Sequence, residues 1–219
     1  MPTKQGKRHL VAAMSILVIA VSCALLILRQ CNGGKTAGLE PFAAAGEVMA
    51  EEANALLGGH GRIVVVTFDT AKTQMPQAMA QLKAFQKRLR DQSGLSVAAV
   101  ETLNVNPSPG MAAWSVAQYY QLVQRLSDVD AIVSFVGPPL LMEPEMRRPV
   151  AQLPRLLVFT GFNPGVPLRK LFERGVVQVA LVNRFTPPPR PASTPHTYRD
   201  WFDQFFQVVQ TDTARTLAY

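Results

Sequence analysis

Short runs of hydrophobic residues alternate along the chain with segments whose apolar residues recur at helical spacing. The runs predict buried strands at 62–68, 95–103, 131–136, 155–160 and 176–182. Most of them are apolar at nearly every position, which is typical of parallel strands that are covered on both faces. Apolar residues at intervals of three and four predict helices at 41–56, 78–92, 114–126 and 166–173.

The order of these elements predicts the fold class. After the first helix, strands and helices alternate, so that consecutive parallel strands are joined by crossover connections. Right-handed crossovers then give an α/β domain with a doubly wound five-stranded parallel sheet and helices on both faces. This is a Rossmann-like, three-layer arrangement, and the expected strand order is 2-1-3-4-5.

Residues 10–28 form a 19-residue stretch without a charged side chain. A helix of this length can cross the hydrocarbon core of a bilayer, which is about 30 Å thick. Basic residues lie mainly before this stretch, which predicts an N-terminal transmembrane anchor with its N-terminus in the cytoplasm and the main domain periplasmic or otherwise extracytoplasmic. A cleaved signal peptide and a lipoprotein modified at Cys23 remain as alternatives.

Charge is concentrated at the N-terminus. The chain has 219 residues and a net charge of +7, from 22 Lys and Arg against 15 Asp and Glu. Residues 1–35 contain five basic residues and no acidic one, which leaves a net charge of +2 for residues 36–219. The body of the protein is therefore nearly neutral, and no nucleic-acid partner is expected.

The predicted elements divide the chain into six parts. We expect a cytoplasmic tail at 1–9, the anchor at 10–28, a spacer at 29–39, the α/β domain at 40–184, a Pro-rich connector at 185–196, and a C-terminal aromatic helix and tail at 197–219. The helix is predicted over 197–210, where Trp201 and Phe205 fall on one side and Phe202 and Phe206 widen the apolar stripe. Such a helix packs onto the domain, or it contacts a protein partner or the membrane surface.

Polar and small residues follow the predicted strands. In an open parallel sheet, ligands bind beyond the carboxyl ends of the strands, close to the point where the strand order reverses. Turn formation alone also favours Gly, Asn, Asp and Thr at such positions. The candidate ligand-binding residues are Asp69, Thr70, Lys72, Gly137, Gly161, Asn163 and Asn183.

The sequence lacks the signatures of several enzyme classes. The segment after the first strand contains no glycine, as a phosphate-binding loop would require, and no G-x-S-x-G nucleophile motif occurs. The three histidines and two cysteines do not have metal-ligand spacing, so no metal and no cofactor are expected. Acid–base chemistry by Asp69 with Lys72 remains open, but the sequence favours a non-enzymatic protein.

Three segments resemble parts of one lobe of a type I periplasmic binding protein, the family that includes the substrate-binding proteins of ABC transporters. They are 61–69 (GRIVVVTFD), 129–133 (VDAIV) and 174–177 (RGVV), and the resemblance spans about residues 61–184. It implies a binding module for a small molecule. Family members have two lobes with the ligand between them, whereas this chain has room for one. An accessory or scaffold subunit of a membrane complex is the alternative function.

Overall fold

A computed structural model describes most of the chain beyond its N-terminal segment. The described residues are 38–69, 75–92, 94–103, 114–126, 128–140, 153–161, 168–184 and 195–214. The predicted anchor at 10–28 lies outside them. Among the helices that are described, none combines the length and the apolar character needed to cross a membrane.

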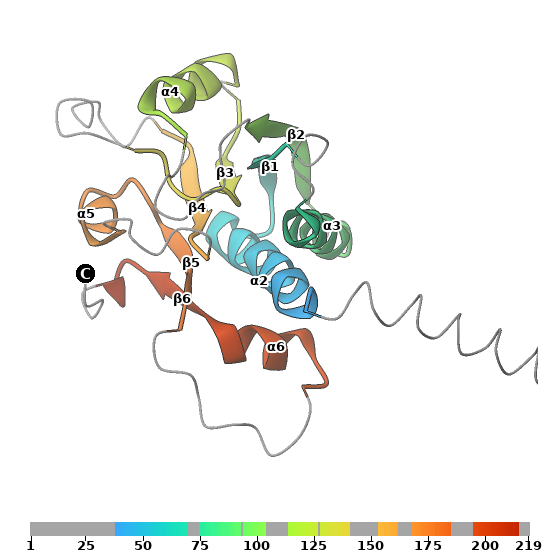
Figure 1. Cartoon of the computed structure of the whole chain (residues 1–219). Helices are drawn as coiled ribbons and strands as arrows, with labels where there is room; N and C mark the ends of the chain where they lie inside the picture. Colours follow the sequence, from blue (N-terminus) through green and yellow to red (C-terminus); the bar gives the residue numbers. More distant parts are fainter. Residues whose placement is uncertain are drawn as a thin grey trace, which may run out of the picture. The chain divides into compact units, whose positions relative to one another are not determined.

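The described elements form one six-stranded sheet with helices packed against it (Figure 1). In chain order they are α2 (Glu40–Leu57), β1 (Gly61–Phe68), α3 (Pro76–Arg90), β2 (Leu95–Leu103), α4 (Val116–Arg125), β3 (Ala131–Ser134), β4 (Arg155–Phe159), α5 (Leu168–Glu173), β5 (Val179–Asn183), α6 (Tyr198–Phe205) and β6 (Phe206–Gln210). The strand order is β2-β1-β3-β4-β5-β6. The first five strands are parallel, which confirms the predicted order 2-1-3-4-5.

The C-terminal region corrects two predictions, the count of five strands and the helix over 197–210. Helix α6 has eight residues and ends at Phe205, and the backbone of the next residue, Phe206, is extended, with φ −130° and ψ 165°. The following residues form β6, a sixth strand that pairs antiparallel with β5. The segment FQVVQ carries two β-branched residues and supports a strand as well as a helix. Backbone hydrogen bonds to the edge of β5 favour the strand over the helix in this segment.

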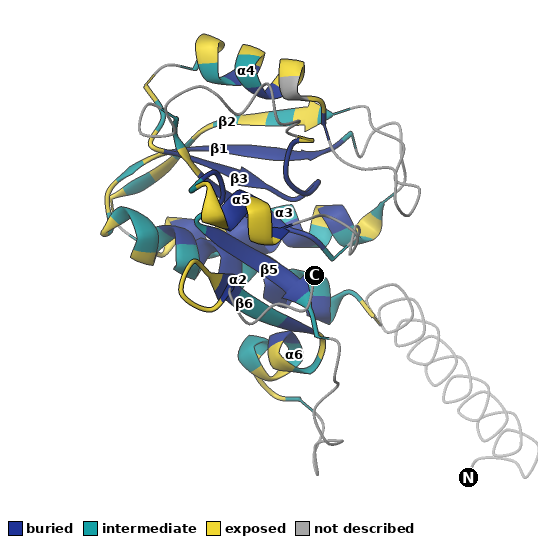
Figure 2. Ribbon diagram, turned by 90° about the vertical axis from the view of Figure 1, so that its left-hand side faces the viewer, coloured by how far each residue is buried: buried dark blue, intermediate teal, exposed yellow. Residues whose placement is uncertain are grey.

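Helices cover both faces of the sheet, as the sequence predicts. Alternate residues of β1 point to opposite sides. Ile63 and Val65 join a core under α2, α3 and α6, whereas Val64 and Val66 join a core under α4 and α5. Figure 2 shows the central strands buried along their length, while the edge strand β2 carries exposed residues.

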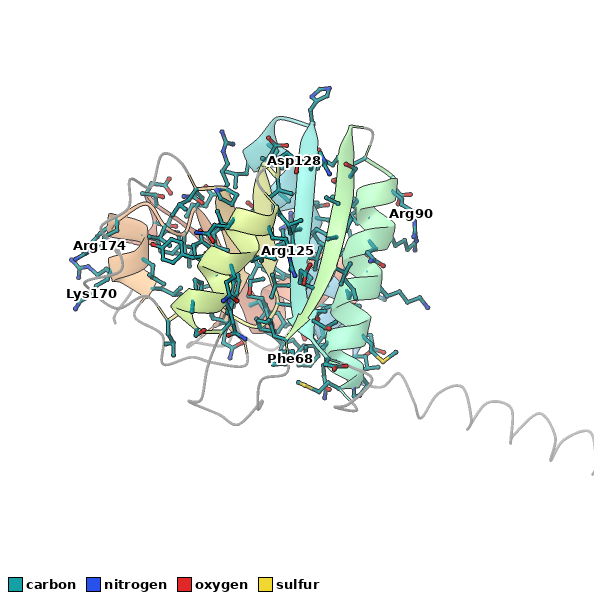
Figure 3. The ribbon with its side chains drawn as sticks, turned by 90° about the horizontal axis from the view of Figure 1, so that it is seen from above. Phe68, Arg90, Arg125, Asp128, Lys170 and Arg174 are labelled. Carbon is teal, nitrogen blue, oxygen red and sulfur yellow. The ribbon has the colours of Figure 1, made fainter. Side chains whose placement is uncertain are left out.

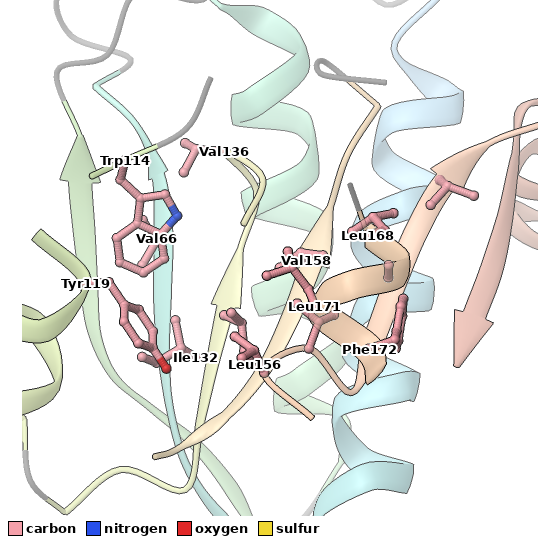
Figure 4. Close-up of a cluster of buried hydrophobic side chains, with 14 of the residues drawn as sticks. Val66, Trp114, Tyr119, Ile132, Val136, Leu156, Val158, Leu168, Leu171 and Phe172 are labelled. Carbon is pink, nitrogen blue, oxygen red and sulfur yellow. The ribbon is translucent and has the colours of Figure 1, made fainter. Parts of the chain in front are cut away.

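The core under α4 and α5 is built from large apolar side chains (Figure 4). Trp114, Tyr119 and Phe172 are each almost completely buried there. Burying one such side chain contributes roughly 1.5–3 kcal/mol to folding. The hydroxyl group of Tyr119 is buried without a hydrogen-bond partner among the described residues, and burial raises its pKa far above the ordinary value.

Helices α2 and α3 pack closely at Gly46. A Cβ atom at this position would clash with the backbone carbonyl of Gln81 on α3. Glycine at position 46 therefore sets how closely the two helices approach. The side chain of Gln81 is fully buried, and neither of its amide atoms has a hydrogen-bond partner among the described residues.

A charged network joins α2, α3 and α6. The Glu51 carboxylate accepts hydrogen bonds from Arg88 at 2.7 Å, from the Tyr198 hydroxyl at 2.5 Å, and from Arg199. Burial on its own raises the pKa of Glu51, but the bonds from Tyr198 and Arg88 and the charge of Arg199 outweigh it and hold the pKa below its ordinary value. The network fixes α6 against the other two helices.

Candidate functional site

The parallel strands β1 to β5 end at one edge of the sheet, and this carboxyl edge is the candidate site. The strand order reverses at β1, which has β2 on one side and β3 on the other. The connections that leave this edge run largely outside the described residues, at 70–74, 104–113, 141–152, 162–167 and 185–194. Thr70, Lys72 and Asn163 belong to them, so the structure places four of the seven candidate residues.

Gly161 and Asn183 meet at the ends of β4 and β5. The Asn183 side-chain amide donates a hydrogen bond to the Gly161 carbonyl at 3.3 Å. A Cβ atom at Gly161 would clash with the ring of Phe159, so the close approach of the chain to this ring requires glycine. The two residues therefore connect the neighbouring ends of β4 and β5. A ligand contact at either residue would be additional to this structural role.

Gly137 closes the turn after β3. Its φ of +92° lies in the region that favours glycine, and its carbonyl accepts hydrogen bonds from the Ser134 hydroxyl at 2.5 Å and from the Trp114 indole at 3.1 Å. The Leu140 amide donates to the Trp114 carbonyl at 3.1 Å. The exit of β3 is thus bonded to the segment before α4.

Asp69 follows the last residue of β1. Its backbone amide donates to the Leu103 carbonyl at 3.2 Å, which extends the pairing of β1 with β2 by one residue. The hydroxyl of the neighbouring Thr67 is buried and has no hydrogen-bond partner among the described residues. Asp69 thus starts the segment at the point where the strand order reverses, which is the position that the sequence predicts for it.

A groove of about 250 Å³ opens between β2 and α4, beside the carboxyl edge. It is lined by Val66, Glu101, Leu103, Trp114, Gln118, Gln121, Leu122 and Arg125. Arg125 and Glu101 form an ion pair at 2.8 Å across it. Apolar walls combined with a few polar groups are the usual make-up of a small-molecule site.

The sequence pattern does not single out the residues of this groove. It places Trp114 only at the start of a helix and Glu101 only in a strand. Trp114 directly precedes Ser115, the N-cap of α4, and its indole donates a hydrogen bond to the Gly137 carbonyl after β3. The position of the groove could not be predicted, because it depends on how α4 lies over the edge strand.

A larger groove of about 510 Å³ lies at the opposite, amino edge of the sheet. Its lining residues are Glu52, Ala55, Leu56, Gln178, Val179, Gln210, Thr211 and Asp212. The Gln210 amide donates to Glu52 at 3.0 Å, and both polar atoms of Gln178 bond to backbone groups of the domain. In the described part of the chain, no group of three or more His, Cys, Asp or Glu side chains could hold a metal ion.

The fold is shared with solved structures of periplasmic sugar-binding proteins. One is an ABC transporter solute-binding protein from Burkholderia graminis in complex with D-arabinose, with 16% sequence identity, a TM-score of 0.54, and coverage of 81% of this chain and 61% of that chain. Another is AraP, an arabinose-binding protein from Geobacillus stearothermophilus, with 16% identity, a TM-score of 0.53, and coverage of 81% and 63%. A sugar-binding protein of a sugar ABC transporter from Bacillus halodurans has 13% identity, a TM-score of 0.54, and coverage of 80% and 64%.

These similarities confirm the expected resemblance to the type I periplasmic-binding-protein fold. At these identities they concern the fold alone. The chain spans somewhat more than three fifths of the length of the three solved proteins. Neither the scan against protein-family models nor the search of curated proteins gave a match.

Proposed function

We propose that this protein is a non-enzymatic binding module for a small polar solute of the sugar class. In this proposal it consists of a single lobe, held at the extracytoplasmic face of a membrane by residues 10–28. The observation that carries the proposal is the meeting of five parallel strand ends at one edge, in a fold shared with sugar-binding proteins.

The proposed ligand site extends from the β1–β3 reversal to the groove beside α4. Asp69 offers a polar group directly after β1, and Val66 of the same strand lines the apolar wall around Trp114. Thr70, Lys72 and Asn163 remain part of the proposed site through their positions in the sequence, and Gly137, Gly161 and Asn183 shape its floor. A sugar has an apolar ring face and several hydroxyl groups, and it suits a wall of this mixed character.

Thermal unfolding of the full chain, purified in detergent, tests the proposal. We expect pools of pentoses and hexoses to raise the melting temperature, because a ligand that binds only the folded state stabilises it. The variant Asp69→Asn should reduce the shift. The matched control is Asp212→Asn at the amino edge, which should leave the shift unchanged. Equal shifts in both variants, or no shift with any sugar, would contradict the proposed site.

Membrane anchoring is a separate part of the proposal. It rests on the 19 uncharged residues at 10–28 and on the basic residues that precede them. We expect the full chain to stay with membranes in alkaline carbonate and to be released when residues 1–35 are deleted. Release of the full chain under these conditions would argue against an anchor.

An accessory or scaffold subunit is the alternative function. The aromatic segment that motivated it is used largely within the domain, since Phe202 and Phe206 are buried in the core under α2. Phe205 remains 46% exposed and is the part of α6 that a protein partner could contact. Co-purification of a partner that is lost in Phe205→Ser, together with no response to any sugar, would favour this alternative.

A further inference from the structure

Helix α3 presents a stripe of basic side chains on its outer face that form no ion pair with the described residues. Met79, Lys83, Lys87 and Arg90 are the exposed residues within this helix after its first position, and their spacing of four, four and three places them along one side. Met79 is 56% exposed. The helix contains no acidic residue.

This stripe differs from the rest of the described surface, where most arginines are paired. Arg62, Arg88, Arg125, Arg169, Arg184 and Arg199 each form an ion pair with a described carboxylate. Lys83, Lys87 and Arg90 form none with any residue that the structure describes. Asp91 at the helix C-cap is the acidic residue next to the stripe, which leaves it a net charge of +2.

The length of chain between the apolar segment and α2 allows this face to reach a bilayer. Helix α3 packs side by side with α2, and α2 begins at Glu40, 12 residues beyond the apolar segment that ends at Leu28. A connection of this length reaches at most about 40 Å, whereas a helix of the length of α3 measures about 22 Å. A connection of this length therefore permits contact between the whole stripe and the surface in which the apolar segment is proposed to be anchored.

We propose that the outer face of α3 lies against anionic phospholipid headgroups. The cations of Lys83, Lys87 and Arg90 complement the lipid phosphates, and Met79 adds an apolar contact at one end of the stripe. Figure 3 shows Arg90 on α3 at one side of the domain and Lys170 and Arg174 on α5 at the opposite side, which would then face away from the membrane. This inference rests on the membrane anchor of the proposed function.

Lysine labelling of the full chain in vesicles tests the contact. The chain is reconstituted into vesicles of phosphatidylcholine alone or with phosphatidylglycerol, labelled with an amine-reactive reagent, and analysed residue by residue by mass spectrometry. We expect labelling of Lys83 and Lys87 to slow roughly fivefold in the anionic vesicles, because each basic residue near such a surface raises the affinity for it by about that factor. Labelling should recover in high salt, because salt screens the attraction. Lys170 serves as the internal control and should react equally in both vesicles.

Two charge-matched variants sharpen the test. Lys83→Gln combined with Arg90→Gln removes two charges from the stripe and keeps Lys87 as the reporter, which should then label nearly as fast as in phosphatidylcholine. Arg169→Gln combined with Arg174→Gln removes two charges from the α5 side and should leave the protection of Lys87 intact.

Each remaining outcome counts against a stated part of the proposal. Equal labelling of Lys83 and Lys87 in both kinds of vesicle, in a chain that floats with the vesicles, overturns the lipid contact, keeps the anchor, and directs the search to an acidic protein partner. A chain that does not float with either kind of vesicle overturns the anchor and this inference together.

Discussion

The two faces of the sheet are held together in different ways. Under α2, α3 and α6, a charged network around Glu51 joins three helices, and α2 and α3 meet closely at Gly46. Under α4 and α5, packing is apolar and a groove opens beside α4. Buried polar groups without a partner among the described residues occur on both sides, at Gln81 and at Tyr119. The side of α2, α3 and α6 is held by charged hydrogen bonds and a close helix contact. The groove of the candidate site opens on the side of α4 and α5.

This difference agrees with a separation of stability and ligand binding between the two sides of the sheet. Regions that bind ligands are generally drawn from the less tightly held parts of a fold, because stability and adaptable contacts make opposing demands. The contrast between the faces therefore leads to predictions in which the same kind of substitution has unlike effects on the two sides.

The largest effect is expected at the close contact between α2 and α3. Gly46→Ala should lower the free energy of unfolding by about 2–3 kcal/mol, because the added methyl group forces the Gln81 backbone away. In an isolated helix the same change would stabilise by about 0.5–1 kcal/mol. The sign of the change in the free energy of unfolding, measured by chemical denaturation, therefore decides whether α2 and α3 pack as closely as described.

The next effect concerns the charged network. Glu51→Gln should destabilise the protein by about 1–2 kcal/mol at pH 7, since it weakens the hydrogen bonds from Arg88, Tyr198 and Arg199. Glu101→Gln is the control, because Glu101 pairs with Arg125 on the other face, and the Arg125 side chain is 62% exposed. Its cost should be well under 1 kcal/mol.

Two tyrosines allow the same substitution on both faces. Tyr198→Phe should cost about 1 kcal/mol, because the hydroxyl donates a bond to Glu51 at 2.5 Å. Tyr119→Phe should be neutral or slightly stabilising, since its hydroxyl is buried without a partner among the described residues. Equal costs for both variants in urea unfolding would remove the contrast between the faces.

The smallest effect is a dependence on pH. The pKa of Glu51 is lowered in the folded protein, so its contribution is present above the unfolded-state pKa of about 4.3 and is lost as the pH falls through the lower folded-state value. The stability difference between the wild type and Glu51→Gln should therefore shrink below about pH 4. A difference that stays constant from pH 7 to pH 3 would contradict a lowered pKa of Glu51 in the folded protein.

The sequence was informative where the pattern is local. Continuous runs such as 62–68 define the strands, and the alternation of strands and helices indicates a doubly wound sheet, for which 2-1-3-4-5 is a common strand order. The pattern could not separate helix from strand at Phe206, because the choice depends on the free edge of β5, which is distant in the sequence. For the same reason, the partners of Glu51 and the groove beside Trp114 depend on helix placement, which no local pattern encodes.

The chain contains two tryptophans, and they lie on opposite faces, so ligand binding can be located by fluorescence. Trp114 lines the groove at the carboxyl edge, and Trp201 packs on the core under α2 and α6. We propose to titrate Trp201→Phe and Trp114→Phe with D-arabinose and with related pentoses and hexoses. A saturable change in the Trp201→Phe protein, with none in the Trp114→Phe protein, is the predicted result. A response from Trp201 alone, or from neither tryptophan, would contradict a sugar site at the carboxyl edge.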